Sequence, residues 1–296
     1  MSQRRFARAA AFDWSGEAVA RPRGIALALC ERDGEGIGTV RLIQPDGGWS
    51  RCAALDWLGE RAAAGDDLLI GMDVSAGLPF ADAGAFFPGW PDSPPDAHAL
   101  WESIDVLSAA DPHFGVAGFL AHAEARAHFR HRGELGVHYG AARAGRLRVV
   151  EQATRTQGIA NPYSSLNLVG AAQVGKASLT AMRLFHRLRG VVPVWPMAPV
   201  PATGPLIVEI YSSIAALAAG RAKGRAKMRE PAAVAAALDR LGARLAIPLA
   251  AVTDHEADAI VTAAWLHRAQ YEAALWSPAQ LTPSLAQTEG WTFGVG

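Results

Sequence analysis

Short apolar runs predict four strands in the first 80 residues. The second and third runs are joined by a short turn segment, in which Asp33-Gly34 is a strong hairpin signal. We therefore expect an antiparallel meander. The fourth run is almost wholly apolar, which is typical of a central parallel strand covered on both faces. In chain order the four runs are 8–14, 24–30, 37–45 and 66–80.

The later part of the chain predicts helices and one more buried strand, and "VVPVWP" (191–196) is a candidate for a further short strand. The buried strand begins the segment 204–220, which then continues as a helix. Between 81 and 163 the pattern loosens, and we interpret this segment as an insertion or lid. The chain is therefore predicted to be one α/β domain over 1–296. The expected helices lie at 50–65, 96–108, 115–132, within 165–190, at 230–243 and at 254–272.

Two aspartates close strands of the predicted sheet. Asp13 ends the first strand and Asp73 ends the apolar core of the fourth. Ligands of open α/β sheets bind beyond the carboxyl ends of parallel strands. If these two strands are parallel neighbours, the carboxylates lie side by side, and each raises the pKa of the other unless a cation lies between them. Mg²⁺ and Mn²⁺ prefer such oxygen ligands.

The last predicted helix begins with polar residues in "TDHEADAIVTAAW" and then becomes apolar. His255 and Asp258 are three residues apart, so they share a helix face and could supply ligands to Asp13 and Asp73. Asp254 and Glu256 have simpler structural roles as alternatives: Asp254 could be the N-cap of this helix, and Glu256 could be a favourable acid in its first turn. Asp258 precedes the apolar run and is expected to face partly inward, where an acid needs a partner or a metal ion.

Glu209 and the basic residues leave alternatives open. Glu209 lies in "LIVEIYSS" and is either a further ligand or an acid satisfied by hydrogen bonds from loop donors. The segment 221–229 is either a phosphate-binding loop or a solvated one. Lys176 ends a stretch rich in amide, hydroxyl and glycine groups that could bind phosphate or cap a helix. The predicted phosphate contacts are Lys176, Arg221, Lys223, Arg225 and Lys227, with Arg229 beside them.

Composition narrows the functional classes. The formal net charge is zero with 28 acidic and 28 basic residues, so any contact with nucleic acid would be local. The two cysteines, Cys30 and Cys52, have no metal-site spacing and are expected to be reduced thiols. No signal peptide and no membrane-length apolar run are evident. These features predict a cytoplasmic globular protein without a membrane partner.

The motifs together carry a resemblance. "FDWSG", "IGMDVSAGLPF", "VEIYSS" and "DHEADAIVTAAW", in this order, resemble the DUF429 family of predicted nucleases with an RNase H-like fold. The last motif also resembles the acidic closing helix of RuvC-type resolvases. The resemblance implies a five-stranded mixed sheet of order 3-2-1-4-5, with strand two antiparallel, flanked by helices. It also implies Mg²⁺- or Mn²⁺-dependent cleavage of phosphodiester bonds by a two-metal mechanism.

The resemblance assigns roles to individual residues. Asp13, Asp73 and Asp258 match the acids of such sites, with Glu209 as a further candidate catalytic residue. His255 stands where resolvases often have an aspartate, and a histidine there could ligate a metal ion or move a proton. The expected partner is a nucleic acid or nucleotide. The sequence does not identify the substrate or the oligomeric state.

Two rival interpretations remain from the sequence. The protein could be a non-catalytic nucleic-acid or nucleotide-binding protein that kept the fold. It could instead be a nucleotide hydrolase of the actin and sugar-kinase type or of the P-loop type. The sequence shows no duplicated half, which argues against the first, whereas Gly170, Gly175 and Lys176 have P-loop spacing. Ala177, however, stands where that motif needs a hydroxyl. In the insertion, a solvated helix face is favoured over a metal site for the histidines, which are His113, His122, His128 and His131.

Overall fold

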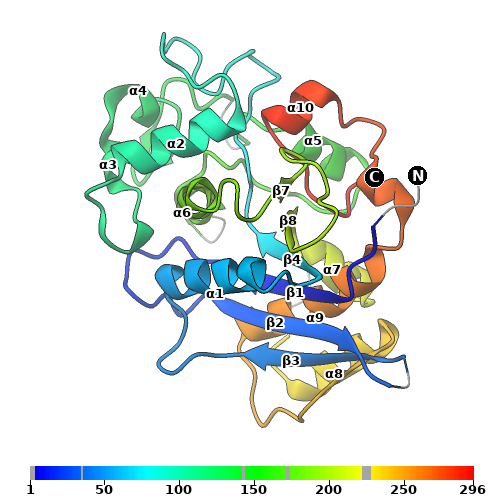
Figure 1. Cartoon of the computed structure of the whole chain (residues 1–296). Helices are drawn as coiled ribbons and strands as arrows, with labels where there is room; N and C mark the ends of the chain where they lie inside the picture. Colours follow the sequence, from blue (N-terminus) through cyan, green and yellow to red (C-terminus); the bar gives the residue numbers. More distant parts are fainter. Residues whose placement is uncertain (1–3, 35, 142–143, 171–173, 222–227) are drawn as a thin grey trace.

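The centre of the molecule is a seven-stranded mixed sheet of order β7-β8-β4-β1-β2-β3-β9. The computed structural model describes every residue except 1–3, 35, 142–143, 171–173 and 222–227 (Figure 1). The strands are β1 (Arg8–Asp13), β2 (Ala26–Arg32), β3 (Gly38–Ile43), β4 (Leu68–Asp73), β7 (Val194–Trp195), β8 (Leu206–Ile210) and β9 (Ala243–Leu245).

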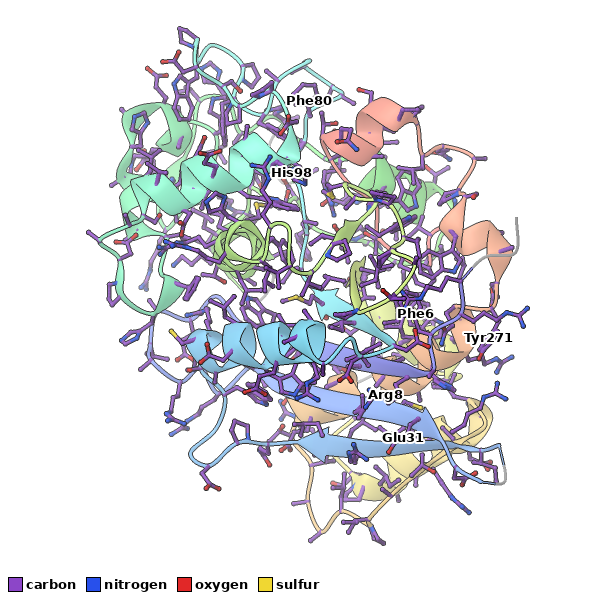
Figure 2. The ribbon with its side chains drawn as sticks, in the orientation of Figure 1. Phe6, Arg8, Glu31, Phe80, His98 and Tyr271 are labelled. Carbon is purple, nitrogen blue, oxygen red and sulfur yellow. The ribbon has the colours of Figure 1, made fainter. Side chains whose placement is uncertain are left out.

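Strand pairing confirms the predicted meander and the predicted central order. β1, β2 and β3 pair antiparallel, and Arg8 and Glu31 are partners across β1 and β2 (Figure 2). β4 pairs parallel with β1 on one side and with β8 on the other. The order β3-β2-β1-β4-β8 is therefore the predicted 3-2-1-4-5.

The sheet has seven strands instead of the predicted five, because a short strand joins each edge; one of them, β7, lies within the candidate strand at 191–196. β7 pairs parallel with β8, and β9 pairs parallel with β3. A helix was predicted up to residue 243, but α8 (Pro231–Arg240) ends earlier. Gly242 adopts φ +69°, a left-handed conformation that terminates the helix and turns the chain towards β3.

Helices cover both faces of the sheet. One face packs against α1 (Arg51–Ala63) and α6 (Val174–Arg187), with α2 (Ala97–Leu107) packed on α6. The other face packs against α7 (Ser212–Ala218), α8 and α9 (Asp254–Ala269). Figure 1 shows α1 and α9 on opposite sides of the strands.

Small residues let α9 lie close to the sheet. Ala9 and Ala11 of β1 belong to the core under α9, whereas Ala10 and Phe12 belong to the core of the other face. Gly71 of β4 also faces α9, and a Cβ atom there would lie 3.1 Å from Cδ2 of Leu266. The first turn of α9 consequently lies at the carboxyl ends of β1 and β4.

The segment predicted as an insertion contains one long helix, α2, which confirms the helix expected at 96–108, and otherwise only short elements. The helix expected at 115–132 is broken, because His122 has extended backbone angles (φ −62°, ψ 126°). None of the helices among the described residues has the length and apolarity to cross a membrane. The elements here are η1 (Pro112–Phe114), α3 (Ala117–Ala121), α4 (Ala123–Arg126), β5 (Arg130–His131), β6 (Glu134–Leu135) and α5 (Val149–Thr156), and the chain ends with η2 (Ala273–Trp276) and α10 (Pro283–Gln287).

Candidate functional site

Strand pairing brings Asp13 and Asp73 together on one face of the sheet. β1 and β4 are parallel neighbours, and Phe12 is the partner of Met72, so the next residues, Asp13 and Asp73, end adjacent strands side by side. Side chains alternate along a strand. Asp13 therefore shares the α9 face with Ala9 and Ala11. By the same alternation, Asp73 shares this face with Gly71.

The electrostatic environment of Asp73 is that of a carboxyl group among other acids. Burial, together with the negative charges of Asp13 and Asp258, raises the pKa of Asp73 to about 8. Ser212, at the start of α7, donates hydrogen bonds from its side chain and backbone that act in the opposite direction. Without a bound cation, Asp73 is therefore largely protonated at neutral pH.

The first turn of α9 supplies the remaining predicted residues. Thr253 is the N-cap, and its hydroxyl and the Glu256 carboxylate form a capping box. The interpretation of Asp254 as the N-cap is therefore wrong. Asp254 instead forms an ion pair with Arg229 at 3.5 Å. Since Thr253 and Glu256 fix the helix start, His255 and Asp258 are presented to the ends of β1 and β4.

His255 contacts Asp13 directly. Nδ1 of His255 lies 2.5 Å from Oδ2 of Asp13. A carboxylate on one ring nitrogen fixes the orientation of an imidazole and favours its protonated form. The structure thus joins His255 and Asp13 as a hydrogen-bonded pair, while Asp258 lies one helical turn further along the same face.

These residues line a cavity of about 980 Å³. Its wall includes all five predicted catalytic residues: Asp13, Asp73, Glu209, His255 and Asp258. Of the predicted phosphate-binding residues, Lys176 and Arg221 also line it. Lys223, Arg225 and Lys227 lie outside the described residues.

Lys176 is positioned by a close approach between two backbone segments. The loop after β1 crosses the first turn of α6, where a Cβ atom on Gly16 would lie 2.4 Å from the backbone nitrogen of Ala177. Only glycine allows this contact. The same loop leads to Arg23, a cavity residue that the sequence did not single out. Two cations, Lys176 and Arg23, therefore face the same cavity as the acids.

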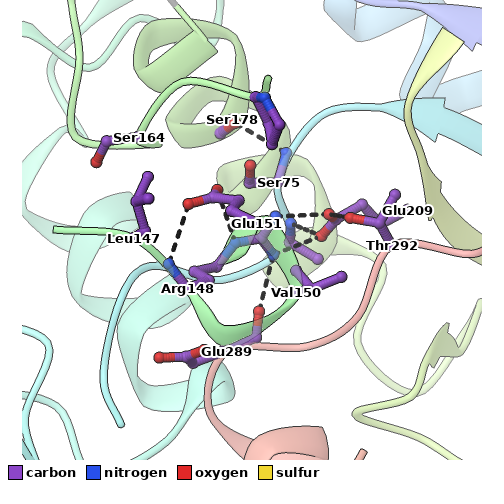
Figure 3. A network of polar contacts seen from close by, with 12 residues as sticks. Ser75, Leu147, Arg148, Val150, Glu151, Ser164, Ser178, Glu209, Glu289 and Thr292 are labelled. Atoms are coloured by element: carbon purple, nitrogen blue, oxygen red, sulfur yellow. Dashed lines mark hydrogen bonds and ion pairs between the residues drawn. The ribbon is translucent and has the colours of Figure 1, made fainter. Parts of the chain in front are cut away.

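Glu209 lies on the opposite face of the sheet from Asp73. Its neighbours Val208 and Ile210 pack in the core under α9, so alternation directs Glu209 to the other side. There Arg148 donates to both carboxylate oxygens, at 2.8 and 2.6 Å (Figure 3). The Ala76 amide (2.8 Å) and the Thr292 hydroxyl also donate, one to each oxygen. A carboxylate has about four acceptor positions, and these four donors occupy them.

Arg148 is in turn held between acids. Its Nε donates to Glu151 at 3.1 Å, and its Nη1 donates to the Glu289 carbonyl at 2.9 Å (Figure 3). Burial would lower the pKa of Arg148, but Glu209 and Glu151 outweigh it and raise the pKa. Burial raises the pKa of Glu151 to about 7 against the attraction of Arg148. The network ties β8, α5 and the chain end together beneath the cavity.

The donor set has the chemistry of a divalent-cation site but is not closed around one. Carboxylates from three elements suit Mg²⁺ or Mn²⁺, and a cation would offset the burial and the repulsion that together raise the pKa of Asp73. Among the described residues, no three His, Cys, Asp or Glu side chains converge as a ready ligand set. Mg²⁺ keeps several waters and uses one or two carboxylates with substrate oxygens, so these residues fit it without full convergence.

Other sequence motifs lie apart from this chemistry. Of the insertion histidines, His122 packs on Trp90, and His128 packs on His138 and is buried instead of lying on the expected solvated helix face. The residues before Gly170 form turns and an isolated bridge instead of the strand that a P-loop requires.

Several cavity residues were missed from the sequence. Arg148 and Glu151 had the helical spacing of an ion pair, which is a usable signal. Tyr163 and Arg23 lie in irregular segments that gave no such pattern. Ser212 begins α7 within the motif "VEIYSS", but no spacing distinguished it there. Comparison of the chain with protein-family models, with curated proteins and with solved structures gives no match.

Proposed function

We propose that the protein is a Mg²⁺- or Mn²⁺-dependent phosphodiester hydrolase with an RNase H-like fold. One observation carries the proposal. Three carboxylates from three different elements, Asp13, Asp73 and Asp258, line one cavity, where burial and then the charges of the other two acids raise the pKa of Asp73. Clustered acids at the carboxyl ends of parallel strands are costly unless they bind a cation.

The sheet supports the same interpretation. An antiparallel meander followed by parallel strands, flanked by helices, is compatible with an RNase H-like fold. The motifs that resemble the DUF429 family supply Asp13, Asp73 and Asp258, which line the cavity. A nuclease of this kind would act on nucleic acid or nucleotides.

Each residue has a role in the proposed chemistry. Bound divalent ions would stabilise the attacking and leaving oxygens of the phosphodiester. Asp13, Asp73 and Asp258 would supply the carboxylate ligands. Asp13 also holds the His255 ring, which is then placed to move a proton at the reacting phosphate. Lys176 and Arg23 would contact non-reacting phosphate oxygens.

Glu209 has a supporting role in this proposal. Its four acceptor positions are occupied, and its partner Arg148 fixes the floor of the cavity. We therefore propose that Glu209 positions the loop after β4 through the Ala76 amide.

A non-catalytic nucleotide- or nucleic-acid-binding protein is the second candidate. The observation that favours it is the absence, within the described part of the chain, of three acidic or imidazole side chains already arranged around an ion site. In that case the cavity would bind phosphate through Lys176 and Arg23 without cleaving it.

Cleavage by two charge-removing variants distinguishes these candidates. We expect the wild type to cleave short oligonucleotides with Mn²⁺, and Asp13→Asn and Asp258→Asn each to lower kcat at least ~100-fold, because asparagine keeps the shape but loses the charge that attracts the ion. Circular dichroism and thermal melting check that the variants remain folded.

Asp56→Asn is the matched control, because Asp56 is exposed on α1 and does not line the cavity. It should leave kcat unchanged. A wild type that binds oligonucleotides but cleaves none with Mg²⁺ or Mn²⁺ would favour the binding protein. Full activity of Asp13→Asn and Asp258→Asn would refute the assigned site.

A further inference from the structure

The cavity has an aromatic wall in addition to its acidic one. Pro162, Tyr163 and Tyr211 line it together with the acids. A volume of about 980 Å³ is that of a site for a small molecule or a single nucleotide unit. The aromatic wall has no part in the chemistry proposed above.

Tyr163 is unusual among the aromatic residues of this protein because it is exposed. Its exposed fraction is 53%, whereas Tyr139, Trp101 and Trp291 are almost fully buried. Among the large apolar and aromatic side chains that are exposed in the described residues, Tyr163 is the one that lines the cavity. An exposed aromatic ring at the wall of a polar cavity has a face available for stacking.

The backbone on both sides of Tyr163 is held in place. Arg155 donates from Nε to the Pro162 carbonyl at 3.1 Å. Ser164 is fully buried, and its hydroxyl donates to the Arg146 carbonyl. The ring therefore projects from a fixed segment, and little conformational entropy is lost when a flat ligand covers it.

Tyr211 connects this wall to the acids. Burial raises the pKa of Tyr211, and the charges of Asp73 and of Tyr163 act on it in the same direction, so it neighbours both. A phosphate at the acid cluster would accordingly have the aromatic wall on one side and the cations Lys176 and Arg23 within the same cavity.

We propose that Tyr163 is a stacking platform for an unpaired nucleobase, so that the site takes single-stranded ends or short oligonucleotides in preference to duplexes. This inference rests on the proposed phosphodiester hydrolase. Bases stack on aromatic side chains with little sequence preference, because every base has a π face. In a duplex both faces of a base are covered by its neighbours, and a cavity of this size admits only a base that has left the stack.

Kinetics with Tyr163→Ala and Tyr163→Phe test the proposal. The substrate is a fluorescent single-stranded oligonucleotide with Mn²⁺, compared with the same strand annealed to its complement and with a strand of abasic residues. We expect Tyr163→Ala to raise KM for the single strand by about tenfold to hundredfold with kcat little changed. Tyr163→Phe should restore KM, because the ring is kept. The abasic strand should respond little to either variant, and the duplex should be cleaved much more slowly.

Tyr271→Ala is the matched control. Tyr271 is also an exposed tyrosine, 39% accessible, but it lies outside the cavity, beside Arg5 and Arg32 (Figure 2). It should leave KM unchanged. An unchanged KM in Tyr163→Ala, an equal loss on the abasic strand, or equal cleavage of the duplex would overturn the stacking site.

Anisotropy of the same labelled strand separates this inference from the hydrolase itself. If the wild type binds the strand, Tyr163→Ala weakens that binding and no cleavage occurs with either metal ion, then the proposed hydrolysis fails and the stacking site stands. If cleavage occurs and no Tyr163 variant alters KM or binding, then the hydrolase stands and the stacking site fails.

Discussion

At the scale of single residues, side-chain direction decides which acids can act together. Asp13, Asp73 and Asp258 were predicted as neighbours from the order of strands and the spacing in the last helix, and the structure brings them to one cavity. Glu209 could not be assigned from the sequence. Its partner Arg148 is 61 residues away in a segment without a clear pattern. Only strand pairing shows which face of the sheet the Glu209 side chain occupies.

Asp73→Asn should stabilise the metal-free protein at alkaline pH. The folded-state pKa is about 8 against an ordinary value of 3.8, so the folded protein keeps a proton that the unfolded chain has released. The free energy of unfolding of the wild type should therefore fall as pH rises from about 4 to about 8 and then level off. The Asp73→Asn variant has no carboxyl group to titrate. At pH 8 its free energy of unfolding should therefore exceed that of the wild type by on the order of 1–3 kcal/mol.

Urea unfolding at pH 5, 6.5 and 8 with chelator measures this difference. Asparagine can still accept a hydrogen bond from Ser212, so the comparison isolates the charge. Asp56→Asn should follow the wild type at every pH. A wild-type stability that does not change between pH 5 and 8, or a variant less stable than the wild type at pH 8, would show that burial and the neighbouring acids do not raise the pKa of Asp73 in the folded protein.

At the scale of elements, the long regular segments followed from the sequence and the short ones did not. α1, α9 and the five central strands lie where they were predicted, because each is a long or continuous apolar segment bounded by turn residues or caps. β9 and the break at His122 depend on contacts with distant segments, and local pattern contains no information about them. The first residue of α9 could be predicted from the sequence, because Thr253 and Glu256 have the spacing of a capping box.

Gly16→Ala should displace the loop after β1 from α6. Its Cβ atom would lie 2.4 Å from the Ala177 nitrogen and 2.5 Å from the Lys176 carbonyl carbon, and both are backbone atoms that cannot rotate away. We expect a loss of about 1–3 kcal/mol in stability. We also expect a higher KM, because Lys176 and the loop that leads to Arg23 would separate. Urea unfolding and steady-state kinetics measure the two effects.

Gly59→Ala is the comparison for this variant. Gly59 lies within α1, and no atom lies within 4 Å of the Cβ that alanine would add. Alanine in a helix should stabilise the protein by about 0.4–1 kcal/mol and leave KM unchanged. If Gly16→Ala behaved like Gly59→Ala, the close approach of the loop to α6 would not position Lys176.

At the scale of the whole molecule, the sheet topology collects the cavity from segments far apart in the chain. β1, β4 and the first turn of α9 supply the acids, and these were predicted. Pro162 and Tyr163 of the aromatic wall and the Arg148 floor come from the segment before α6, whose irregular sequence gave no element pattern, whereas Tyr211 follows β8. A ligand that touches acids, cations and the aromatic wall together would link segments from residue 13 to residue 258.

Ligand binding at such a site should raise the melting temperature of the whole protein. Free Mn²⁺ at ten times its Kd should stabilise the folded state by about 1.4 kcal/mol, which is a rise on the order of 3 °C for a chain of this size. A mononucleotide together with Mn²⁺ should raise it further, because phosphate oxygens complete the shell of the ion and the base covers Tyr163. Differential scanning calorimetry measures both shifts. The Asp13→Asn/Asp258→Asn double variant should show neither, since its cavity has lost two of the charges that attract the ion. A shift of equal size in that variant would place the ion elsewhere on the protein.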